Sequence, residues 1–370
     1  MNVLYLTMNP NRGSTTAPTE GWLHYLPKRG LNPVVVSRQQ GNFHDWVLEQ
    51  GIPAYLNPLA DPNKYAPWRF FWSLLKLCKI CVKHRVELIH CNEQNIYPIG
   101  QYLAKLLRVP VVVSVHFTME RGFCRWAFGK SKQPDRMFFV SKGNLEACHD
   151  AINGIIDESR WRILNNAIDT FRYIPDTKSG SNFRKEWNIE RKYVIGVACA
   201  LRARKQIEHL FEVTKSLGAD FHVVLAGGPV PGDELYANEL IKRGQDLLGE
   251  QLSYVGHLED LRPFCNAIDL FINTSKEESF GIAALEAMAC GTPVVGYPSK
   301  AVDCVVLPGG GVITPQDDPE TLVETVNSIV ANRQWLNELR AGARERAVSE
   351  FDWTLCCERL WGEYDSLINK

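Results

Sequence analysis

Two glutamates, Glu278 and Glu286, flank the start of a predicted helix. The apolar run 267–273 predicts a buried strand, and the Ala-, Leu- and Met-rich run 282–290 predicts a helix. Residues 279–281 therefore lie outside the carboxyl end of a parallel strand, where free backbone N–H groups favour an anion. Carboxylates beside an anion site suit a ligand that also carries hydroxyl groups, such as a sugar ring or a ribose.

A second group of polar residues follows the strand predicted at 193–198. Arg202, Arg204 and Lys205 lie in the turn between this strand and a helix predicted at 206–217. Because this turn also belongs to the ligand edge of a parallel sheet, three cations there predict a phosphate site.

Two further candidates come from the first half of the chain. His116 ends a strand predicted at 110–116, and Gly13 lies in the loop after the first strand, 3–7. That loop has no G-x-G-x-x-G, so a dinucleotide-binding fingerprint is not supported. On residue type alone, a structural histidine and an ordinary turn remain the alternatives.

The segment from Glu278 to Val295 resembles the E-x7-E signature of the retaining glycosyltransferases of family 4, which have the GT-B fold. In that family the first glutamate contacts the transferred sugar, the second contacts the ribose, and the intervening amides face the diphosphate. The resemblance therefore implies donor binding by six residues: Glu278, Ser279, Phe280, Gly281, Ile282 and Glu286.

The same resemblance assigns roles to the other candidates. Lys205 matches the lysine that neutralises the diphosphate leaving group, but position 200 is Ala where the family has Arg, so Arg202 or Arg204 would substitute. His116 matches the histidine beside the donor sugar, and Gly13 the glycine that lets the backbone approach the diphosphate. His116, Lys205 and Glu278 are the implied catalytic residues.

The elements that must position these residues form two successive series of alternating strands and helices. This pattern predicts an α/β protein with two doubly wound, Rossmann-like parallel sheets, which in the GT-B fold face a central cleft. We expect an N-terminal acceptor-side domain, 1–168, completed by a crossover helix at 353–370, and a nucleotide-sugar-binding domain, 169–352. The polar stretch 176–182 is predicted to be a linker.

Composition excludes several classes of protein. The formal net charge of −1 argues against nucleic-acid binding, and eleven scattered cysteines suit reduced thiols in a cytoplasmic protein. Cys78 and Cys81 have C-x2-C spacing without a second pair, which favours structural thiols over a zinc site. The short N-terminal run predicts a strand rather than a signal peptide or a membrane span. No D-x-D occurs, so we expect no metal and no other cofactor.

The segment 64–85 has two interpretations. It mixes Trp, Phe and Leu residues with a stripe of lysines at 76, 79 and 83. It is either a core helix with a solvated basic face or an interfacial helix that makes peripheral contact with the inner face of a membrane.

Together these observations and the resemblance predict a retaining hexosyltransferase. It would move a hexose from a nucleotide-sugar, with a UDP-sugar favoured, to a hydroxyl of a sugar, lipid-linked or small-molecule acceptor, in the synthesis of a glycan, glycolipid or glycoconjugate. The alternatives are a GT-B nucleotide-sugar epimerase or phosphorylase, and a degenerate protein that binds sugar nucleotides without turnover.

Overall fold

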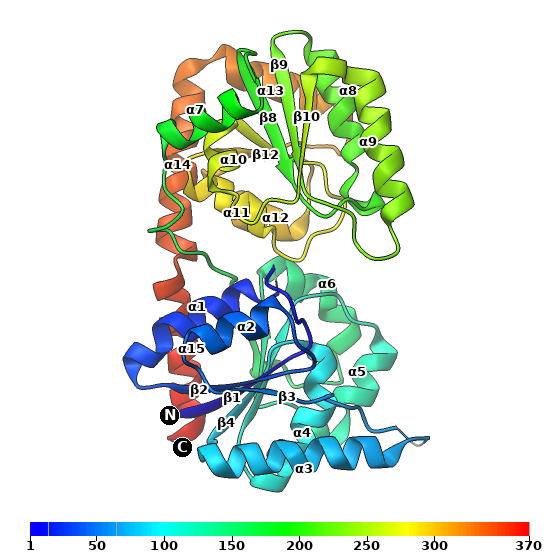
Figure 1. Cartoon of the computed structure of the whole chain (residues 1–370), viewed down its shortest axis with the longest axis vertical. Coiled ribbons are helices and arrows are strands. Elements are labelled where there is room, and N and C mark those ends of the chain that lie inside the picture. Colours follow the sequence, from blue (N-terminus) through cyan, green and yellow to red (C-terminus); the bar gives the residue numbers. More distant parts are fainter. Residues whose placement is uncertain (14, 64, 370) are drawn as a thin grey trace. The chain divides into compact units, whose positions relative to one another are not determined.

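The computed structural model describes residues 1–13, 15–63 and 65–369. Lys64, which begins the predicted segment 64–85, lies outside the described residues. The chain divides into two compact units (Figure 1). Unit 1 comprises Met1–Ala167 and Trp353–Lys370, and unit 2 comprises Ile168–Asp352.

Unit 1 is built on a parallel sheet of seven strands in the order β3-β2-β1-β4-β5-β6-β7. The strands are β1 (Asn2–Thr7), β2 (Asn32–Ser37), β3 (Ala54–Leu56), β4 (Leu88–Cys91), β5 (Val111–Val115), β6 (Arg136–Phe139) and β7 (Trp161–Ile163). The helices are α1 (Ala17–Tyr25), α2 (Asn42–Glu49), α3 (Pro67–His84), α4 (Tyr97–Leu107), α5 (Arg121–Phe128), α6 (Lys142–Ile152) and α15 (Trp353–Ile368).

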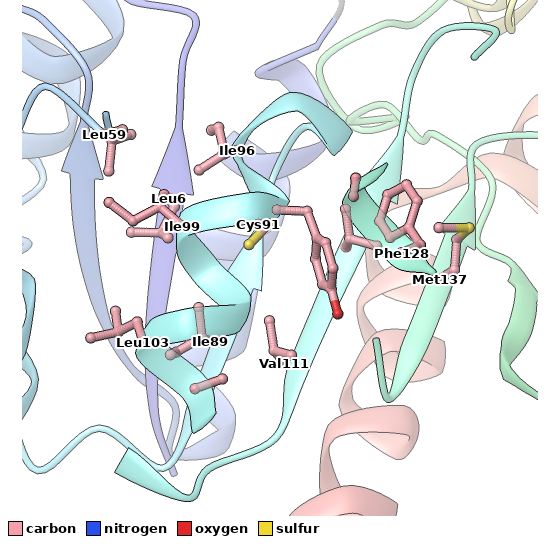
Figure 2. Packing of buried hydrophobic residues seen from close by; sticks show 14 of the residues in the cluster. Leu6, Leu59, Ile89, Cys91, Ile96, Ile99, Leu103, Val111, Phe128 and Met137 are labelled. Atoms are coloured by element: carbon pink, nitrogen blue, oxygen red, sulfur yellow. The ribbon is translucent and has the colours of Figure 1, made fainter. Parts of the chain in front are cut away.

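Both faces of this sheet are covered by helices, so the central strands β1, β4 and β5 are buried along almost their whole length. Helices α3 to α6 cover one face, and Figure 2 shows part of that core, where Ile99 and Leu103 of α4 meet Ile89 of β4. Helices α1, α2 and α15 cover the other face. The C-terminal helix α15 is fastened there by Tyr364, whose hydroxyl lies within hydrogen-bond distance of Nδ1 of the buried His90.

Unit 2 is built on a parallel sheet of six strands in the order β10-β9-β8-β11-β12-β13. The strands are β8 (Tyr193–Ala198), β9 (Phe221–Ala226), β10 (Leu252–Gly256), β11 (Leu270–Asn273), β12 (Val294–Gly296) and β13 (Gly311–Ile313). The helices are α7 (Thr177–Glu186), α8 (Ile207–Leu217), α9 (Glu234–Leu248), α10 (Arg262–Ala267), α11 (Ile282–Ala289), α12 (Lys300–Val306), α13 (Pro319–Ala331) and α14 (Arg333–Phe351). The predicted fold class, with two doubly wound parallel sheets, is confirmed.

Strand order reverses once in each sheet, and this reversal positions the candidate residues. In unit 1 the order runs outward from β1 in one direction and from β4 in the other, and in unit 2 it does the same from β8 and β11. The loops after the two strands at such a reversal diverge to opposite faces of the sheet and leave a crevice between them, where α/β proteins bind ligands. The loop with Gly13 follows β1, and the turn with Lys205 follows β8.

The linker predicted at 176–182 is wrong, because these residues form the start of α7. Asp176 caps this helix by accepting a hydrogen bond from the Ser179 N–H at 3.0 Å. Gly180 faces the backbone of α10 so closely that a Cβ there would lie 2.1 Å from the Asn266 carbonyl oxygen. The polar and small residues that suggested a linker therefore have other roles, since Asp176 caps α7 and Gly180 allows α7 to pack closely against α10.

Candidate active site

Two loops of unit 2 are joined at the reversal of its sheet. One follows β8 and contains Arg204 and Lys205, and the other follows β11 and leads to α11. The Lys276 N–H donates to the Arg204 carbonyl at 3.0 Å, and Arg204 Nη1 donates to the Glu277 carbonyl at 2.8 Å. Thr274 Oγ1 also donates to the Lys205 carbonyl, at 2.8 Å. These bonds hold the two loops as one structure although some 70 residues separate them.

An ion pair between Lys205 and Glu278 lies at the centre of this structure. The ammonium group donates to Glu278 Oε1, which also accepts from Ser275 Oγ at 3.0 Å. The Lys205 side chain is 8% exposed and that of Glu278 is 16% exposed. An ammonium group has three N–H donors, and the pair with Glu278 occupies one, so donors remain for an anion.

The start of α11 supplies backbone donors next to this pair. Gly281 is the N-cap residue with φ of 95°, in the left-handed region that favours glycine. Phe280 is buried and its ring packs edge-on against that of Phe351, which anchors the loop before α11. Ile282 is the first residue of the helix, and Ser279 precedes the buried anchor. The first N–H groups of a helix have no intrahelical partner and favour an anion.

Glu286 lies on α11 itself, where its carboxylate accepts a hydrogen bond from the Tyr173 hydroxyl at 2.7 Å. Burial raises the pKa of Glu286 to about 7, against the opposing effect of the Tyr173 hydrogen bond. The sequence interpretation missed Tyr173. It lies four residues after Asp169, and its position in the sequence alone shows no link to a helix more than a hundred residues later.

The two arginines of the β8 turn have partners of their own. Arg202 forms an ion pair with Asp233 at 2.8 Å, and both side chains are about two-fifths exposed. Arg204 is exposed and uses one nitrogen to brace the second loop. Of the two, Arg204 therefore has more free donors near Lys205, whereas the charge of Arg202 is already matched by a carboxylate.

In unit 1 the structure places Gly13 and His116 on different loops. Gly13 is exposed, and a Cβ there would meet nothing within 4 Å, so no packing contact requires a glycine. His116 follows β5 and is 3% exposed, and its backbone N–H donates to Gln94 Oε1. Burial lowers the pKa of the imidazole to about 4, so His116 is neutral at pH 7.

His116 Nε2 is a buried nitrogen without a hydrogen-bond partner among the described residues. On the loop after β4, the buried Glu93 accepts hydrogen bonds from Thr7 Oγ1 and the Met8 N–H. Burial raises the pKa of this carboxyl group. Sequence reasoning missed Glu93, although its place directly after a buried strand is a signal for the ligand edge.

Within residues 1–13, 15–63 and 65–369, no group of three or more His, Cys, Asp and Glu side chains is placed to hold a metal ion. Cys78 and Cys81 lie on α3, partly buried and buried respectively, and burial raises the pKa of both thiols. They are packed thiols of a helix.

Two family models match the chain, and the boundary between them lies close to the boundary between the two units. Residues 20–172 match the model of Glycosyltransferase Family 4, and residues 180–347 match that of Glycosyl transferases group 1. Between them the two matches take in most of the chain, one for each sheet.

Three curated relatives illustrate the similarity. The D-inositol 3-phosphate glycosyltransferase 1 of Catenulispora acidiphila is 32% identical over 45% of this chain and 40% of its own length. The alpha-maltose-1-phosphate synthase of Mycolicibacterium smegmatis is 27% identical over 55% of this chain and 56% of its own. The chain thus spans about half the length of these two. An Escherichia coli UDP-Gal:alpha-D-GlcNAc-diphosphoundecaprenol alpha-1,3-galactosyltransferase is 21% identical over 93% of this chain and 92% of its own.

Solved structures share the fold over the whole chain. HepE of Anabaena, in complex with UDP-glucose, aligns with a TM-score of 0.86 at 21% identity, over 99% of this chain and 100% of that one. The sucrose-phosphate synthase of Thermosynechococcus elongatus aligns with a TM-score of 0.76 at 17% identity, over 100% and 99%. At sequence identities of 21% and 17%, this structural similarity shows that the fold is shared.

Proposed function

The chain belongs to glycosyltransferase family 4, with the GT-B fold, and on that premise we propose that it transfers a hexose from a UDP-sugar to an acceptor hydroxyl with retention of anomeric configuration. That it is a glycosyltransferase follows from the family. The donor, the acceptor and the stereochemical course are the proposal.

The pair of Lys205 with Glu278, beside the first N–H groups of α11, is the observation that carries this proposal. A sugar diphosphate presents an anion next to a hydroxylated ring, and this arrangement presents cationic and backbone donors next to a carboxylate. We assign Lys205 and the start of α11 to the diphosphate, Glu278 to the sugar, and Glu286 to the ribose. Stabilising the charge that develops on the departing diphosphate is the main catalytic effect of such donors.

We propose a front-face route for the transfer. The bond from the anomeric carbon to the phosphate oxygen breaks, and its electron pair stays on that oxygen. The acceptor oxygen forms its bond to the anomeric carbon on the same face, while its proton passes to the released phosphate oxygen. In this route Glu278 stabilises the positive charge of an oxocarbenium-like transition state, and Lys205 stabilises the leaving group. No cofactor is required.

The preference for uridine rests on the relatives, since one is named for UDP-Gal and a structural neighbour was solved with UDP-glucose. A nucleotide-sugar epimerase or phosphorylase and a non-catalytic binding protein use the same kind of site. They differ from a transferase in what they require and what they release. An epimerase needs no acceptor, a phosphorylase needs phosphate, and a binding protein releases no product.

The test is a calorimetric screen of UDP-, GDP- and ADP-hexoses, followed by NMR of the product. We expect a UDP-hexose to bind, and UDP to be released only when a hydroxyl acceptor is added, with the anomeric configuration of the product equal to that of the donor. Binding of only a GDP- or ADP-sugar would show that the donor base is wrong. An inverted product would refute the retaining mechanism, and UDP release without an acceptor glycoside would refute the transfer.

We further propose that α3 contacts an anionic membrane surface. Large apolar side chains are exposed along this helix, among them Trp68 at 60%, Trp72 at 65% and Val82 at 69% exposure. Phe71 and Leu75 are also exposed and lie on the same stripe, while Phe70, Leu77 and Cys81 on the opposite side enter the core of unit 1. Figure 1 shows α3 at an edge of unit 1, beside α4.

The charge around this face of α3 supports an anionic partner. No acidic residue occurs between Asp61 and Glu87, while Arg69, Lys76, Lys79 and Lys83 are all exposed on or beside the apolar stripe. Exposed Trp residues next to lysines suit the interface of an anionic bilayer. Across the described residues, no helix is both long and apolar enough to span a membrane, so this contact would be peripheral.

Co-sedimentation with vesicles tests this contact. Each lysine near an anionic surface contributes about 1 kcal/mol, so replacing Lys76, Lys79 and Lys83 by Gln is expected to weaken binding to phosphatidylglycerol vesicles about a hundredfold at low salt. The control replaces three exposed lysines elsewhere, Lys105, Lys178 and Lys242, by Gln. Equal loss in both triple variants, or equal binding to neutral and anionic vesicles, would refute the assignment to α3.

A further inference from the structure

Tyr173 and Glu286 form a hydrogen bond that joins two parts of unit 2 distant in sequence. Tyr173 lies in the segment before α7, and its hydroxyl donates to Glu286 Oε1 at 2.7 Å. Both side chains are partly buried. A carboxylate has two oxygens with about four lone-pair sites, so this bond holds one oxygen in place and leaves Oε2 for another donor.

The backbone that carries Tyr173 is itself held to α11. Arg344 of α14 donates through Nη1 to the carbonyls of Tyr173, at 2.6 Å, and of Ala289, at 2.7 Å. Its Nη2 donates to the Thr170 carbonyl at 2.9 Å. Ala289 is the last residue of α11, where carbonyls lack intrahelical partners and a cation is favourable. Arg344 thus fixes the tyrosine segment and the helix that carries Glu286 as one rigid group.

The charged groups around Glu286 do not replace the tyrosine. Asp260 disfavours the carboxylate, while Arg172 favours it, and burial is the largest effect. Arg262 is bound to Asp260 through two nitrogens, and the thiols of Cys265 and Cys290 face the same region. Tyr173 therefore provides the direct hydrogen bond to the carboxylate that these neighbours do not.

We propose that Tyr173 is a positioning residue, which holds Glu286 ionised and oriented so that Oε2 accepts a hydrogen bond from a ribose hydroxyl of the donor. This rests on the proposed function, in which Glu286 binds the ribose. Since a ribose hydroxyl donates best to a charged acceptor, donor affinity increases as Glu286 loses its proton. Without the tyrosine hydroxyl the pKa of Glu286 is higher, and that increase moves to higher pH.

The first measurement is the dissociation constant of UDP-glucose between pH 6 and 9, by calorimetry. The diphosphate of this probe is esterified at both ends and does not titrate in that range. We expect the affinity of the wild type for UDP-glucose to rise as the pH passes about 7, the pKa of the Glu286 carboxyl group. Tyr173→Phe should weaken binding about tenfold at pH 7 and much less at pH 9, whereas Glu286→Gln should bind weakly at every pH. A loss that is the same at pH 7 and pH 9 would overturn the proposal.

A second measurement needs no ligand. Glu286 has a higher pKa in the folded chain than its ordinary value of 4.5, so its ionisation costs stability as pH rises above that value. Removing the tyrosine hydroxyl increases this cost, so Tyr173→Phe should lower the urea midpoint more at pH 8 than at pH 5. The matched control is Tyr254→Phe, which removes a hydroxyl that donates to the Gly227 carbonyl at 3.1 Å and should act equally at both pH values.

The two measurements separate the two hypotheses. If the urea midpoint of Tyr173→Phe shows the expected pH dependence and UDP-glucose does not bind the wild type, the donor assignment is wrong and the ribose role falls with it. If UDP-glucose binds but Tyr173→Phe behaves like Tyr254→Phe in urea and leaves affinity unchanged, the positioning role is refuted and the proposed function stands.

Discussion

Replacing Lys205 by Ala tests the proposed chemistry most directly. Its ammonium group forms the ion pair with the Glu278 carboxylate, three residues before the N-cap residue of α11, and its side chain is largely buried. Charge on the leaving diphosphate grows in the transition state, so the loss falls on kcat. One such electrostatic donor is worth roughly a hundredfold or more in kcat, which corresponds to about 2.7 kcal/mol of barrier.

The same substitution has a cost in stability that can be worked from the structure. Without Lys205, Glu278 keeps its hydrogen bond from Ser275, and its side chain is already 16% exposed when the lysine is present. Breaking a fully buried pair costs about 3–5 kcal/mol, but water reaches this carboxylate, so we expect about 1–2 kcal/mol. The double variant Lys205→Ala/Glu278→Gln removes the unpaired charge and should recover part of that stability without recovering kcat.

Steady-state kinetics with a titrated donor and a saturating acceptor measure the first effect, and urea denaturation measures the second. Lys215→Ala is the control, because this lysine is exposed on α8 of the same unit, away from the two loops. If Lys205→Ala keeps kcat within threefold of the wild type while it loses stability as expected, Lys205 is a structural partner of Glu278 and the assignment to the leaving group is wrong.

Three further outcomes are expected. Glu286→Gln should raise the donor KM and spare kcat, because the ribose is bound alike in the ground and transition states. Glu278→Gln should instead lower kcat more than it raises KM. The reverse pattern in steady-state kinetics would mean that the donor lies in the opposite direction along α11. Turnover should persist in EDTA, and activity lost there and restored by manganese would contradict the prediction of a metal-independent reaction. Gly281→Ala should lower the free energy of unfolding, measured in urea, by about 1 kcal/mol. The reason is that φ at Gly281 is 95° and a Cβ there would lie 3.3 Å from Val302 Cγ2. The control Gly362→Ala, where a Cβ on α15 meets open space, should not lower the free energy of unfolding.

The amino-acid sequence by itself predicted the fold class and the family. Alternating apolar runs and Ala- or Leu-rich runs determine which segments become strands and helices, because that choice depends on neighbouring residues. The turn after β8 and the start of α11 could be recognised in the same way, since a strand followed by a helix places its loop at the ligand edge of a parallel sheet. The linker prediction at 176–182 failed because a helix cap and a close glycine contact use the same residue types as a loop.

The partners of each site residue were decided only by the tertiary structure. Lys205 meets Glu278 because β8 and β11 are neighbours in the sheet, an order that no local pattern encodes. Arg202 is matched by Asp233, and Glu286 by Tyr173, across distances in sequence over which spacing carries no information. Local sequence determines which element a residue joins, whereas strand order and packing determine which charges face one another and therefore which of them remain available to a substrate.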